Sequence, residues 1–370
     1  MDAFVAIAAQ FTIQGQVIDL QEFGNGNINR TFLVTLEDGE DERFVLQCIN
    51  TQVFPQPELV MQNLRRFSDH ARQRLQYDPL QPNRRWEVPR VLLTQDGQDC
   101  WIDGDGGFWR AISFIEGAQS FDTIQNAVHA QEIGLALGTF HKLLSDLPAD
   151  KLADTLEGFH ITPRYLQNYQ AVLAKHLAST ASPASAELAY CLQFVRDRAP
   201  WATVLEQAKA EGKLQLRPIH GDPKINNILI DRHSSQAISL IDLDTVKPGL
   251  VHYDIGDCLR SGCNPLGEET EQWQSVRFES DLCEAILEGY LSTASVFLTA
   301  YDYDYLYDAI RLIAFELGLR FLTDYLAGNV YFKTRHPEHN LARALVQFKL
   351  TESIEAQAET IRAMIGAIAS

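Results

Sequence analysis

The sequence predicts an α+β fold of two lobes, in which a small antiparallel β-sheet lobe with one helix precedes a larger, mainly helical lobe. Three observations lead to this prediction. The chain of 370 residues is longer than one average domain. Its first hundred or so residues alternate β-branched and aromatic runs with turn residues, whereas apolar residues recur at helical spacing after Gly117. We therefore expect lobes at residues 1–117 and 118–370, with a ligand cleft between them.

Runs of β-branched and aromatic residues predict the strands of the first lobe. These strands are expected at residues 17–20, 31–36, 43–49, 88–94 and 108–115. Segments rich in glycine, asparagine and aspartate, such as 24–27 and 37–40, separate them and are typical of turns. The stretch 58–75 indicates a single helix.

Helical periodicity dominates the second lobe. Five apolar residues at helical spacing predict one amphipathic helix: Ile133, Leu137, Phe140, Leu144 and Leu147. Thr162 and Pro163 predict the start of another helix, with the threonine as its N-cap and the proline at its first position. One β-like segment at about 214–244 interrupts the remaining helical sequence.

The composition disfavours several classes of partner. The net charge is −18, from 31 basic and 49 acidic residues, and an acidic surface repels phosphate backbones and anionic lipid. No window approaches ~18 uninterrupted apolar residues, and the N-terminal residues contain no basic leader. Six scattered cysteines without a C-x-x-C pair are typical of reduced thiols and argue against a zinc site. We expect a cytoplasmic protein with small-molecule partners, and neither nucleic acid nor a membrane.

The densest group of polar residues lies in two neighbouring segments, 219–231 and 240–245. Asp222, Lys224 and Asn227 share a loop before an apolar run, and Asp242 ends the next apolar run. Two carboxylates, an amide oxygen and an ammonium group are what magnesium–nucleotide chemistry requires. Each residue alone also suits an ordinary hairpin turn, which is the alternative interpretation. As a set at this spacing, they favour phosphoryl transfer.

The motif H-G-D-x-K-x-x-N at residues 220–227 resembles the catalytic loop of the protein-kinase-like fold, in the form found in aminoglycoside phosphotransferases and choline kinases. The segment I-D-L-D at 241–244 is similar to the magnesium-binding motif that follows this loop, and Y-D-I-G-D at 253–257 is similar to the next motif. The resemblance implies a two-lobed kinase-like fold and a small-molecule phosphotransferase that uses ATP and Mg²⁺.

The same resemblance implies a role for each matched residue. Asp222 would accept the proton of the substrate hydroxyl, and Lys224 would neutralise charge on the transferred phosphoryl group. Asn227 and Asp242 would bind Mg²⁺. Two further residues would support the catalytic loop structurally, His220 and Asp254.

The resemblance also implies nucleotide contacts in the first lobe. Gly24 and Gly26 lie where such kinases cover the phosphates, although a plain hairpin is the alternative. Backbone groups near Ile115 and Gly117 would bind adenine. Gln47 occupies the third-strand position of the usual phosphate-binding lysine, and it can donate a hydrogen bond but supplies no charge. No G-x-x-x-x-G-K-[ST] motif occurs, which excludes a P-loop enzyme.

Several stretches resemble one branch of this family, the N-acetylhexosamine 1-kinases, in which glutamine at the position of Gln47 is usual. These stretches are residues 24–32, 46–50, 159–165, 222–227, 241–249, 316–326 and 330–332. In that branch the equivalents of Arg320 and Tyr331 hydrogen-bond the sugar, and the equivalent of Asn27 lies against it. Ser261 stands where the branch has an aromatic residue.

The residues themselves leave the role of Arg320 open. Arg320 borders an apolar helical stripe, so its guanidinium needs an acceptor such as a sugar hydroxyl or a carboxylate. The alternative is an internal pair with Glu316 or Asp324, each four residues away. A core or surface position is the alternative for Tyr331. Three histidines are expected to be structural, His141, His160 and His252.

Together these observations predict an ATP- and Mg²⁺-dependent kinase of the anomeric hydroxyl of N-acetylglucosamine or N-acetylgalactosamine. The products would be the sugar 1-phosphate and ADP. One alternative is a kinase of another hydroxyl compound, such as an amino alcohol, an aminoglycoside or a different sugar. A less favoured alternative is a non-catalytic, nucleotide-binding pseudokinase, supported by Gln47 and opposed by the complete catalytic set.

Overall fold

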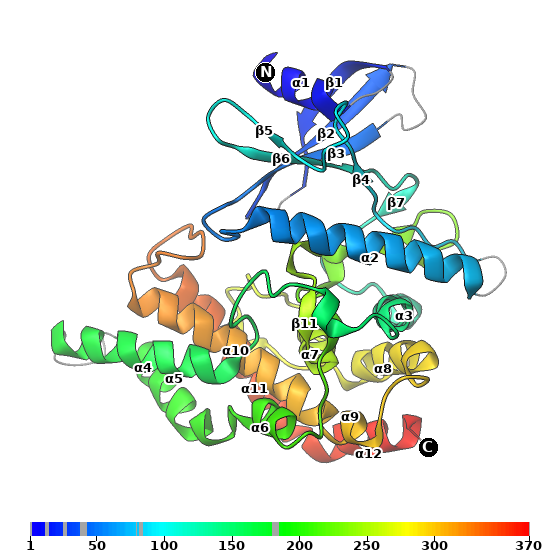
Figure 1. The fold of residues 1–370 in the computed structure, drawn as a ribbon. Coiled ribbons are helices and arrows are strands. Elements are labelled where there is room, and N and C mark those ends of the chain that lie inside the picture. The colour runs from blue at the N-terminus through cyan, green and yellow to red at the C-terminus, as the bar shows by residue number, and fades with distance from the viewer. Residues whose placement is uncertain are drawn as a thin grey trace.

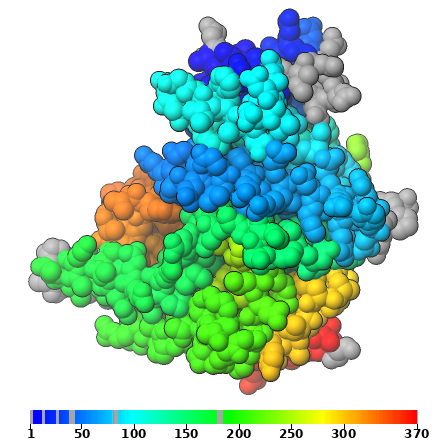
Figure 2. Space-filling model, viewed as in Figure 1, coloured from blue at the N-terminus to red at the C-terminus, as the bar shows by residue number. Residues whose placement is uncertain are grey.

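The computed structural model describes residues 2–11, 15–24, 28–37, 43–78, 80, 84–179 and 185–369. Strands β1 to β6 form the upper lobe in Figure 1, and most helices form the lower one. Helix α2 lies between the lobes, and in Figure 2 its side chains fill the space between them on the face shown. This architecture confirms the predicted α+β fold of two lobes.

The N-terminal sheet is antiparallel throughout, with the strand order β1-β2-β3-β6-β4 and with β5 paired to β6. The strands are β1 (Gln16–Glu22), β2 (Arg30–Glu37), β3 (Arg43–Ile49), β4 (Val91–Leu92), β5 (Trp101–Ile102) and β6 (Phe108–Ser113). The predicted strand at 88–94 is reduced to the two residues of β4. The remaining residues of that prediction have no ladder partner in the sheet.

The two faces of this sheet have different neighbours. One face carries Phe32, Leu46 and Trp109, which pack with Ile7 of helix α1 in a separate small core. Because side chains alternate along a strand, Gln47 and Arg110 lie on the opposite face. Ile49 and Phe108, on that opposite face, belong to the main core with α2 and the C-terminal lobe. The face of Gln47 and Arg110 is therefore the one turned toward the rest of the molecule.

The helices of the described chain are α1 (Asp2–Ala8), α2 (Pro57–Tyr77), α3 (Ala127–Leu144), α4 (Thr162–Ser179), α5 (Ala186–Arg198), α6 (Val204–Ala210), α7 (Val251–Gly262), α8 (Ser280–Ala294), α9 (Ala300–Asp304), α10 (Leu306–Leu326), α11 (His339–Ala356) and α12 (Ala358–Ile368). In the described residues, no helix is both long and apolar enough to cross a membrane.

Helices α3 and α8 approach each other closely because small residues line their interface. A Cβ atom added to Gly134 would lie 1.8 Å from the carbonyl oxygen of Ile286, and one added to Gly289 would lie 2.0 Å from that of Gln131. Side chains at these positions would push the backbones apart. Buried residues of both helices belong to the main core.

Two small antiparallel sheets in the C-terminal lobe position the two polar segments at 219–231 and 240–245. Strands β9 (Ile228–Asp231) and β10 (Ala237–Leu240) form a hairpin that also pairs with β7 (Ala118–Gln119). Strand β8 (Arg217–Ile219) pairs with β11 (Lys247–Gly249). The loop from 220 to 227 and the loop from 241 to 246 join these two sheets, so they run side by side. This region matches the predicted β-like segment, with β11 added at its end.

Some local predictions fail for identifiable reasons. The helix predicted from apolar spacing is α3, but Leu147 lies beyond its end at Leu144. Thr162 is the first residue of α4 and its hydroxyl donates to Glu316 at 2.6 Å, which is not the N-cap role predicted for it. All six cysteines are free, and four of them are buried.

Candidate active site

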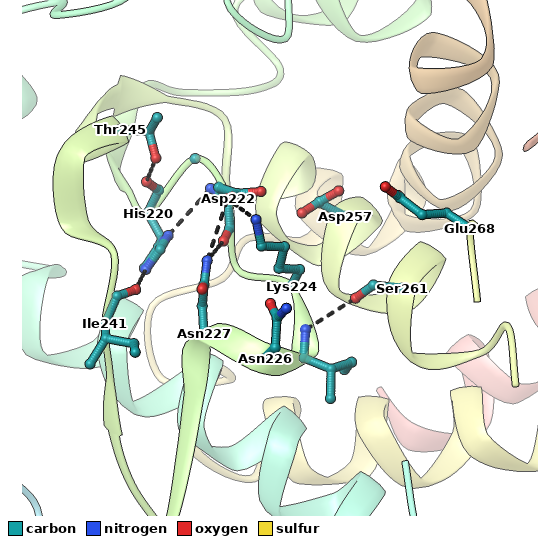
Figure 3. A network of polar contacts seen from close by, with 12 residues as sticks. His220, Asp222, Lys224, Asn226, Asn227, Ile241, Thr245, Asp257, Ser261 and Glu268 are labelled. Carbon is teal, nitrogen blue, oxygen red and sulfur yellow. Dashed lines mark hydrogen bonds and ion pairs between the residues drawn. The ribbon is translucent and has the colours of Figure 1, made fainter. Parts of the chain in front are cut away.

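The loop between β8 and β9 gathers the polar residues of the H-G-D-x-K-x-x-N motif (Figure 3). Lys224 Nζ lies 2.9 Å from Asp222 Oδ2. Asn227 Nδ2 donates to the backbone oxygen of Asp222 at 2.8 Å. Because the amide nitrogen of Asn227 is engaged inside the loop, its amide oxygen is turned to a different side. The loop thus brings one carboxylate, one ammonium group and one amide together.

The loop is fastened to the segment after β10. Thr245 Oγ1 donates to the backbone oxygen of His220 at 2.8 Å, and His220 Nε2 lies 3.0 Å from the carbonyl oxygen of Ile241. Since a carbonyl oxygen only accepts, Nε2 must carry the proton. Gly221 has φ = +87°, and an added Cβ would lie 2.7 Å from the oxygen of Thr245. Glycine is therefore required here, both by conformation and by space.

Asp254 of α7 accepts hydrogen bonds from the backbone of the same loop. Its Oδ2 accepts the N–H of His220 at 2.7 Å, and its Oδ1 accepts the N–H of Gly221 at 2.8 Å. His141 Nε2 of α3 lies 2.9 Å from Oδ2. Burial alone would raise the pKa of Asp254, but these bonds favour the charged form and hold the pKa below its ordinary value. Asp254 therefore connects α3, α7 and the loop.

Asp242 adopts a left-handed backbone conformation, with φ = 64° and ψ = 57°. This conformation is uncommon for a residue with a Cβ, and such residues cluster at functional sites. Its carboxylate is accessible to solvent although protein surrounds it on most sides, as at the floor of a cleft. This desolvation, together with the negative charges of Asp244 and Asp222, raises the pKa of Asp242 to about 7.

The oxygen donors of this region suit Mg²⁺. Asp242 offers an accessible carboxylate, and Asn227 offers an amide oxygen that accepts no hydrogen bond within the described chain. No cluster of three or more His, Cys, Asp or Glu side chains in the described ranges forms a metal site by itself. That pattern fits magnesium, which is commonly held by one or two protein oxygens together with substrate phosphates. The crowding of Asp222, Asp242 and Asp244 also favours a bound cation.

The predicted nucleotide contacts are distributed around the upper lobe. Gly24 lies at the end of β1 with φ = +77°, while Gly26 and Asn27 lie outside the described residues. Ile115 and Gly117 lie in the connection from β6 to β7 that joins the lobes. The carbonyl oxygen of Gly117 accepts the N–H of Arg232 at 2.9 Å, which fixes this connection against the β9–β10 hairpin.

Gln47 has both ends of its side-chain amide engaged within the protein. Its Nε2 donates to Thr31 Oγ1 at 3.1 Å, and its Oε1 accepts from Arg110 Nη2 at 2.7 Å. Arg110 also pairs with Asp244, and both of these charged residues are buried. Asn29 Nδ2 donates to the other oxygen of Asp244 at 2.5 Å. The sequence analysis missed Arg110, although an arginine inside the apolar strand 108–113 was a visible signal.

The guanidinium of Arg320 has no carboxylate partner among the described residues, so the predicted alternative of a pair with Glu316 or Asp324 is wrong. Both carboxylates are engaged elsewhere: Glu316 bonds His160 and Thr162, and Asp324 accepts backbone N–H groups of 330–332. Arg320 instead lies among three aromatic rings, with its Cζ 5.2, 5.1 and 5.5 Å from the centroids of Phe159, Tyr165 and Phe332.

Tyr331 belongs to the same region but is 55% exposed, which leaves its hydroxyl open to solvent. Burial would lower the pKa of Arg320, but Tyr165, Glu316, Tyr331 and Asp222 together raise it. Arg320 is thus within electrostatic reach of both Tyr331 and the catalytic loop.

A second charged group near Lys224 was not expected from the sequence. Figure 3 shows Asp257 and Glu268 on the side of Lys224 that faces away from His220. Arg260 links them, with Nε 2.8 Å from Asp257 Oδ1 and Nη1 3.3 Å from Glu268 Oε2. The second oxygen of Asp257 is buried without a hydrogen-bond partner in the described chain. Ser261, which like Asp257 and Arg260 lies on α7, accepts a hydrogen bond from the N–H of Ile225 at 3.3 Å.

A paired aspartate and lysine, an oxygen-donor aspartate and a braced glycine loop between two lobes define the class of small-molecule phosphotransferases. Comparisons with known proteins agree with this class. The family model described as "Phosphotransferase enzyme family" matches residues 19–286. Because the match covers most of the chain, the protein belongs to this family.

Solved structures share the fold across both lobes. An aminoglycoside phosphotransferase from Alicyclobacillus acidocaldarius subsp. acidocaldarius is 16% identical with a TM-score of 0.63, and the match covers 98% of this chain and 96% of that one. A choline kinase from Cryptosporidium parvum is 15% identical with a TM-score of 0.61, and the match covers 98% of this chain and 97% of that one. A microcompartment-associated aminopropanol kinase is 20% identical with a TM-score of 0.59, and the match covers 97% of this chain and 98% of that one. Matched aminoglycoside phosphotransferases also include complexes with ADP and with GDP.

Proposed function

We propose that this phosphotransferase transfers the γ-phosphate of ATP to the anomeric hydroxyl of an N-acetylhexosamine, N-acetylglucosamine or N-acetylgalactosamine. The single observation that carries the proposal of phosphoryl transfer is the convergence of Asp222, Lys224, Asn227 and Asp242 from two adjoining loops. Phosphoryl transfer depends mostly on positioning and electrostatics, so this set suffices without a covalent intermediate.

Asp222 acts as the proton acceptor. Burial would raise its pKa, but the charge and hydrogen bond of Lys224 lower it, so the carboxylate stays ionised near neutral pH. The sugar hydroxyl oxygen forms a bond to the γ-phosphorus as the bond to the β–γ bridging oxygen breaks. The hydroxyl proton passes to Asp222, and ADP leaves with the bridging oxygen.

Lys224, Asn227 and Asp242 serve the phosphates. The Lys224 ammonium group is held beside Asp222 and compensates the negative charge gathered there. Asn227 and Asp242 would hold Mg²⁺, which when bound would neutralise phosphate charge. Asp254 and His220 keep the loop in one geometry through buried hydrogen bonds. Gly24, Gly26, Ile115 and Gly117 complete the nucleotide side of the proposal.

Arg320, Tyr331 and Asn27 form the proposed sugar contacts. Arg320 carries donors that no described carboxylate uses, and three aromatic rings hold its guanidinium in place. Sugar hydroxyls and an N-acetyl carbonyl are neutral oxygen acceptors, which suit a guanidinium donor. A cationic substrate would be repelled by the same group.

An amino-alcohol or aminoglycoside kinase is the second candidate, because one observation favours it. Asp257 has a buried oxygen without a described partner and lies beside Glu268 near Lys224, so these carboxylates could pair with an ammonium group. Arg260 already neutralises part of their charge, which favours the sugar.

Release of ADP from MgATP with a panel of hydroxyl compounds tests the proposal. The panel contains N-acetylglucosamine, N-acetylgalactosamine, choline, aminopropanol, an aminoglycoside and water alone. Turnover with a hexosamine supports the proposed substrate. Turnover with choline, aminopropanol or the aminoglycoside and with no hexosamine would favour the second candidate. Absence of ADP release with every compound would favour a pseudokinase.

A further inference from the structure

The phosphate side of the site has few positive charges. Three carboxylates meet there, those of Asp222, Asp242 and Asp244, and a nucleotide would add several more negative charges. The ammonium group of Lys224 is already paired with Asp222. Strand β3 has the neutral Gln47 at the position where a cation was expected. A further cation on the nucleotide side would help to offset this charge.

Within the described strands of the N-terminal sheet, Arg110 is the one charged side chain that is buried, at 1% exposure. It stands directly across from Gln47 in the β3–β6 register, and Gln47 stands across from Thr31 of β2. The three residues therefore form a row on the sheet face that is turned toward the C-terminal lobe. Arg110, at one end of this row, donates a hydrogen bond to Asp244 of the C-terminal lobe, which lies two residues after Asp242.

Gln47 serves to orient this guanidinium. Its Oε1 accepts from both Nε and Nη2 of Arg110, at 3.0 and 2.7 Å, while its Nε2 is fixed by Thr31. Arg110 Nη2 also bonds Asp244. The remaining terminal nitrogen, Nη1, is buried and has no hydrogen-bond partner in the described chain. A buried donor without an acceptor is costly, and a phosphate oxygen would satisfy it.

We propose that Arg110 supplies the positive charge of the nucleotide-phosphate site, with Gln47 and Asp244 holding its guanidinium so that Nη1 donates to a phosphate oxygen. This inference rests on the proposed phosphotransferase function and deepens it. The phosphate-binding cation would then lie on β6, the hydrogen-bonded neighbour of β3, and not on β3 itself. Glutamine at position 47 then follows, because a lysine there would face Arg110 directly and the two charges would repel.

Binding of ADP and of adenosine, measured by calorimetry, tests the role because only ADP carries phosphates. In Arg110→Met we expect ADP affinity to fall about 10- to 100-fold, the loss typical of one hydrogen bond to a charged group. Adenosine affinity should stay within about twofold, since its binding needs no cation. Arg110→Lys keeps the charge and should lose less than Arg110→Met.

A charge exchange between the two strands makes the test sharper. The double variant Gln47→Lys/Arg110→Met returns one cation to the row and should recover most of the ADP affinity. Gln47→Lys alone puts two cations side by side and should lower the melting temperature without improving ADP binding. Because Arg110→Met leaves Asp244 buried without its partner, Arg110→Met/Asp244→Asn serves if the single variant is unstable.

Arg198→Met is the matched control. Arg198 forms a half-buried pair with Glu355 in the C-terminal lobe and also lies over an aromatic ring. Like Arg110 it is paired with a carboxylate, but it is less buried and lies outside the N-terminal sheet. Its change should leave ADP binding as in the wild type. Equal loss of ADP and adenosine affinity in Arg110→Met, or no loss of either, would overturn the inference while the proposed function survived. Failure of the wild type to bind ADP would instead remove the proposed function.

Discussion

The backbone N–H of His220 donates to the buried carboxylate of Asp254 at 2.7 Å, across 34 residues of sequence. The next N–H, that of Gly221, donates to the other oxygen of the same carboxylate. Both donors precede Asp222 directly. A rigid helix residue thus sets the backbone position of the proposed proton acceptor, and this relationship underlies the first prediction.

Asp254→Asn should both destabilise the protein and reduce turnover. An asparagine has one acceptor oxygen and would turn its amide group toward a backbone N–H, so one buried donor loses its acceptor. Loss of a buried charged partner costs about 3–5 kcal/mol. Chemical denaturation measures this free energy of unfolding. Asp96→Asn, in an exposed turn, is the control and should change the free energy by less than about 0.5 kcal/mol. Equal stability of both variants would contradict this account.

Stability should depend on pH through His160. Its ring nitrogens lie 2.9 Å from Glu316 Oε1 and 2.7 Å from the carbonyl oxygen of Gly221. Two acceptors require a doubly protonated ring. Burial would lower the pKa of His160, but Glu316 and its neighbours raise it above the ordinary value of 6.5.

Because the folded-state pKa is the higher one, the stabilisation by His160 is complete below about pH 6.5 and is lost as the pH rises through the folded-state pKa. The free energy of unfolding of the wild type minus that of His160→Gln should therefore shrink as the pH rises. His233→Gln changes an exposed histidine and serves as the control substitution. A His160 difference that stays constant or grows would refute this prediction.

The close contact of α3 and α8 predicts opposite effects for two glycine-to-alanine changes. Gly134→Ala places a methyl group against the backbone of Ile286 and should destabilise by about 1–3 kcal/mol or more. Gly366→Ala, on α12, meets no atom within 4 Å and should stabilise by about 0.5–1 kcal/mol, because alanine favours the helix. Thermal unfolding measures both. A neutral Gly134→Ala would mean that the two helices are less tightly packed than described.

Arg320→Met should affect the sugar and spare the nucleotide. Loss of a guanidinium hydrogen bond to the substrate should raise the KM for the hexosamine about tenfold or more, with the KM for ATP within about twofold. Arg311→Met is the matched control, because Arg311 lies on the same helix, over the rings of Trp201 and Tyr307, and pairs with Asp308. Parallel changes in both KM values would assign Arg320 a structural role instead.

Much of the fold and the catalytic loop could be predicted because the signals are local. Residues 220–227 are contiguous, so one short loop brings their polar side chains together. The pair of Arg110 and Asp244 is separated by 134 positions, and only the β3–β6 register and the packing of the lobes bring the two residues together. No periodicity or motif in the chain encodes that meeting.

For Arg320, the sequence predicted possible partners that the structure does not pair with it. Helical spacing correctly placed Glu316 and Asp324 one turn away on either side, but spacing does not say which partners those carboxylates prefer. His160, just before α4, and Thr162, the first residue of α4, bind Glu316, and the loop after α10 binds Asp324. The guanidinium of Arg320 instead lies among aromatic rings from these same two segments, Phe159 and Tyr165 from the first and Phe332 from the second, which local patterns could not reveal.

Identification of the phosphorylated product by ³¹P NMR tests the central claim most directly. Wild-type protein with MgATP and N-acetylglucosamine or N-acetylgalactosamine should give ADP and a sugar phosphate with its phosphorus coupled to the anomeric proton. Asp222→Asn should bind ADP normally and form this product about 10²–10⁴ times more slowly, as expected for loss of a general base. A phosphate on another hydroxyl, or undiminished transfer by Asp222→Asn, would contradict the account.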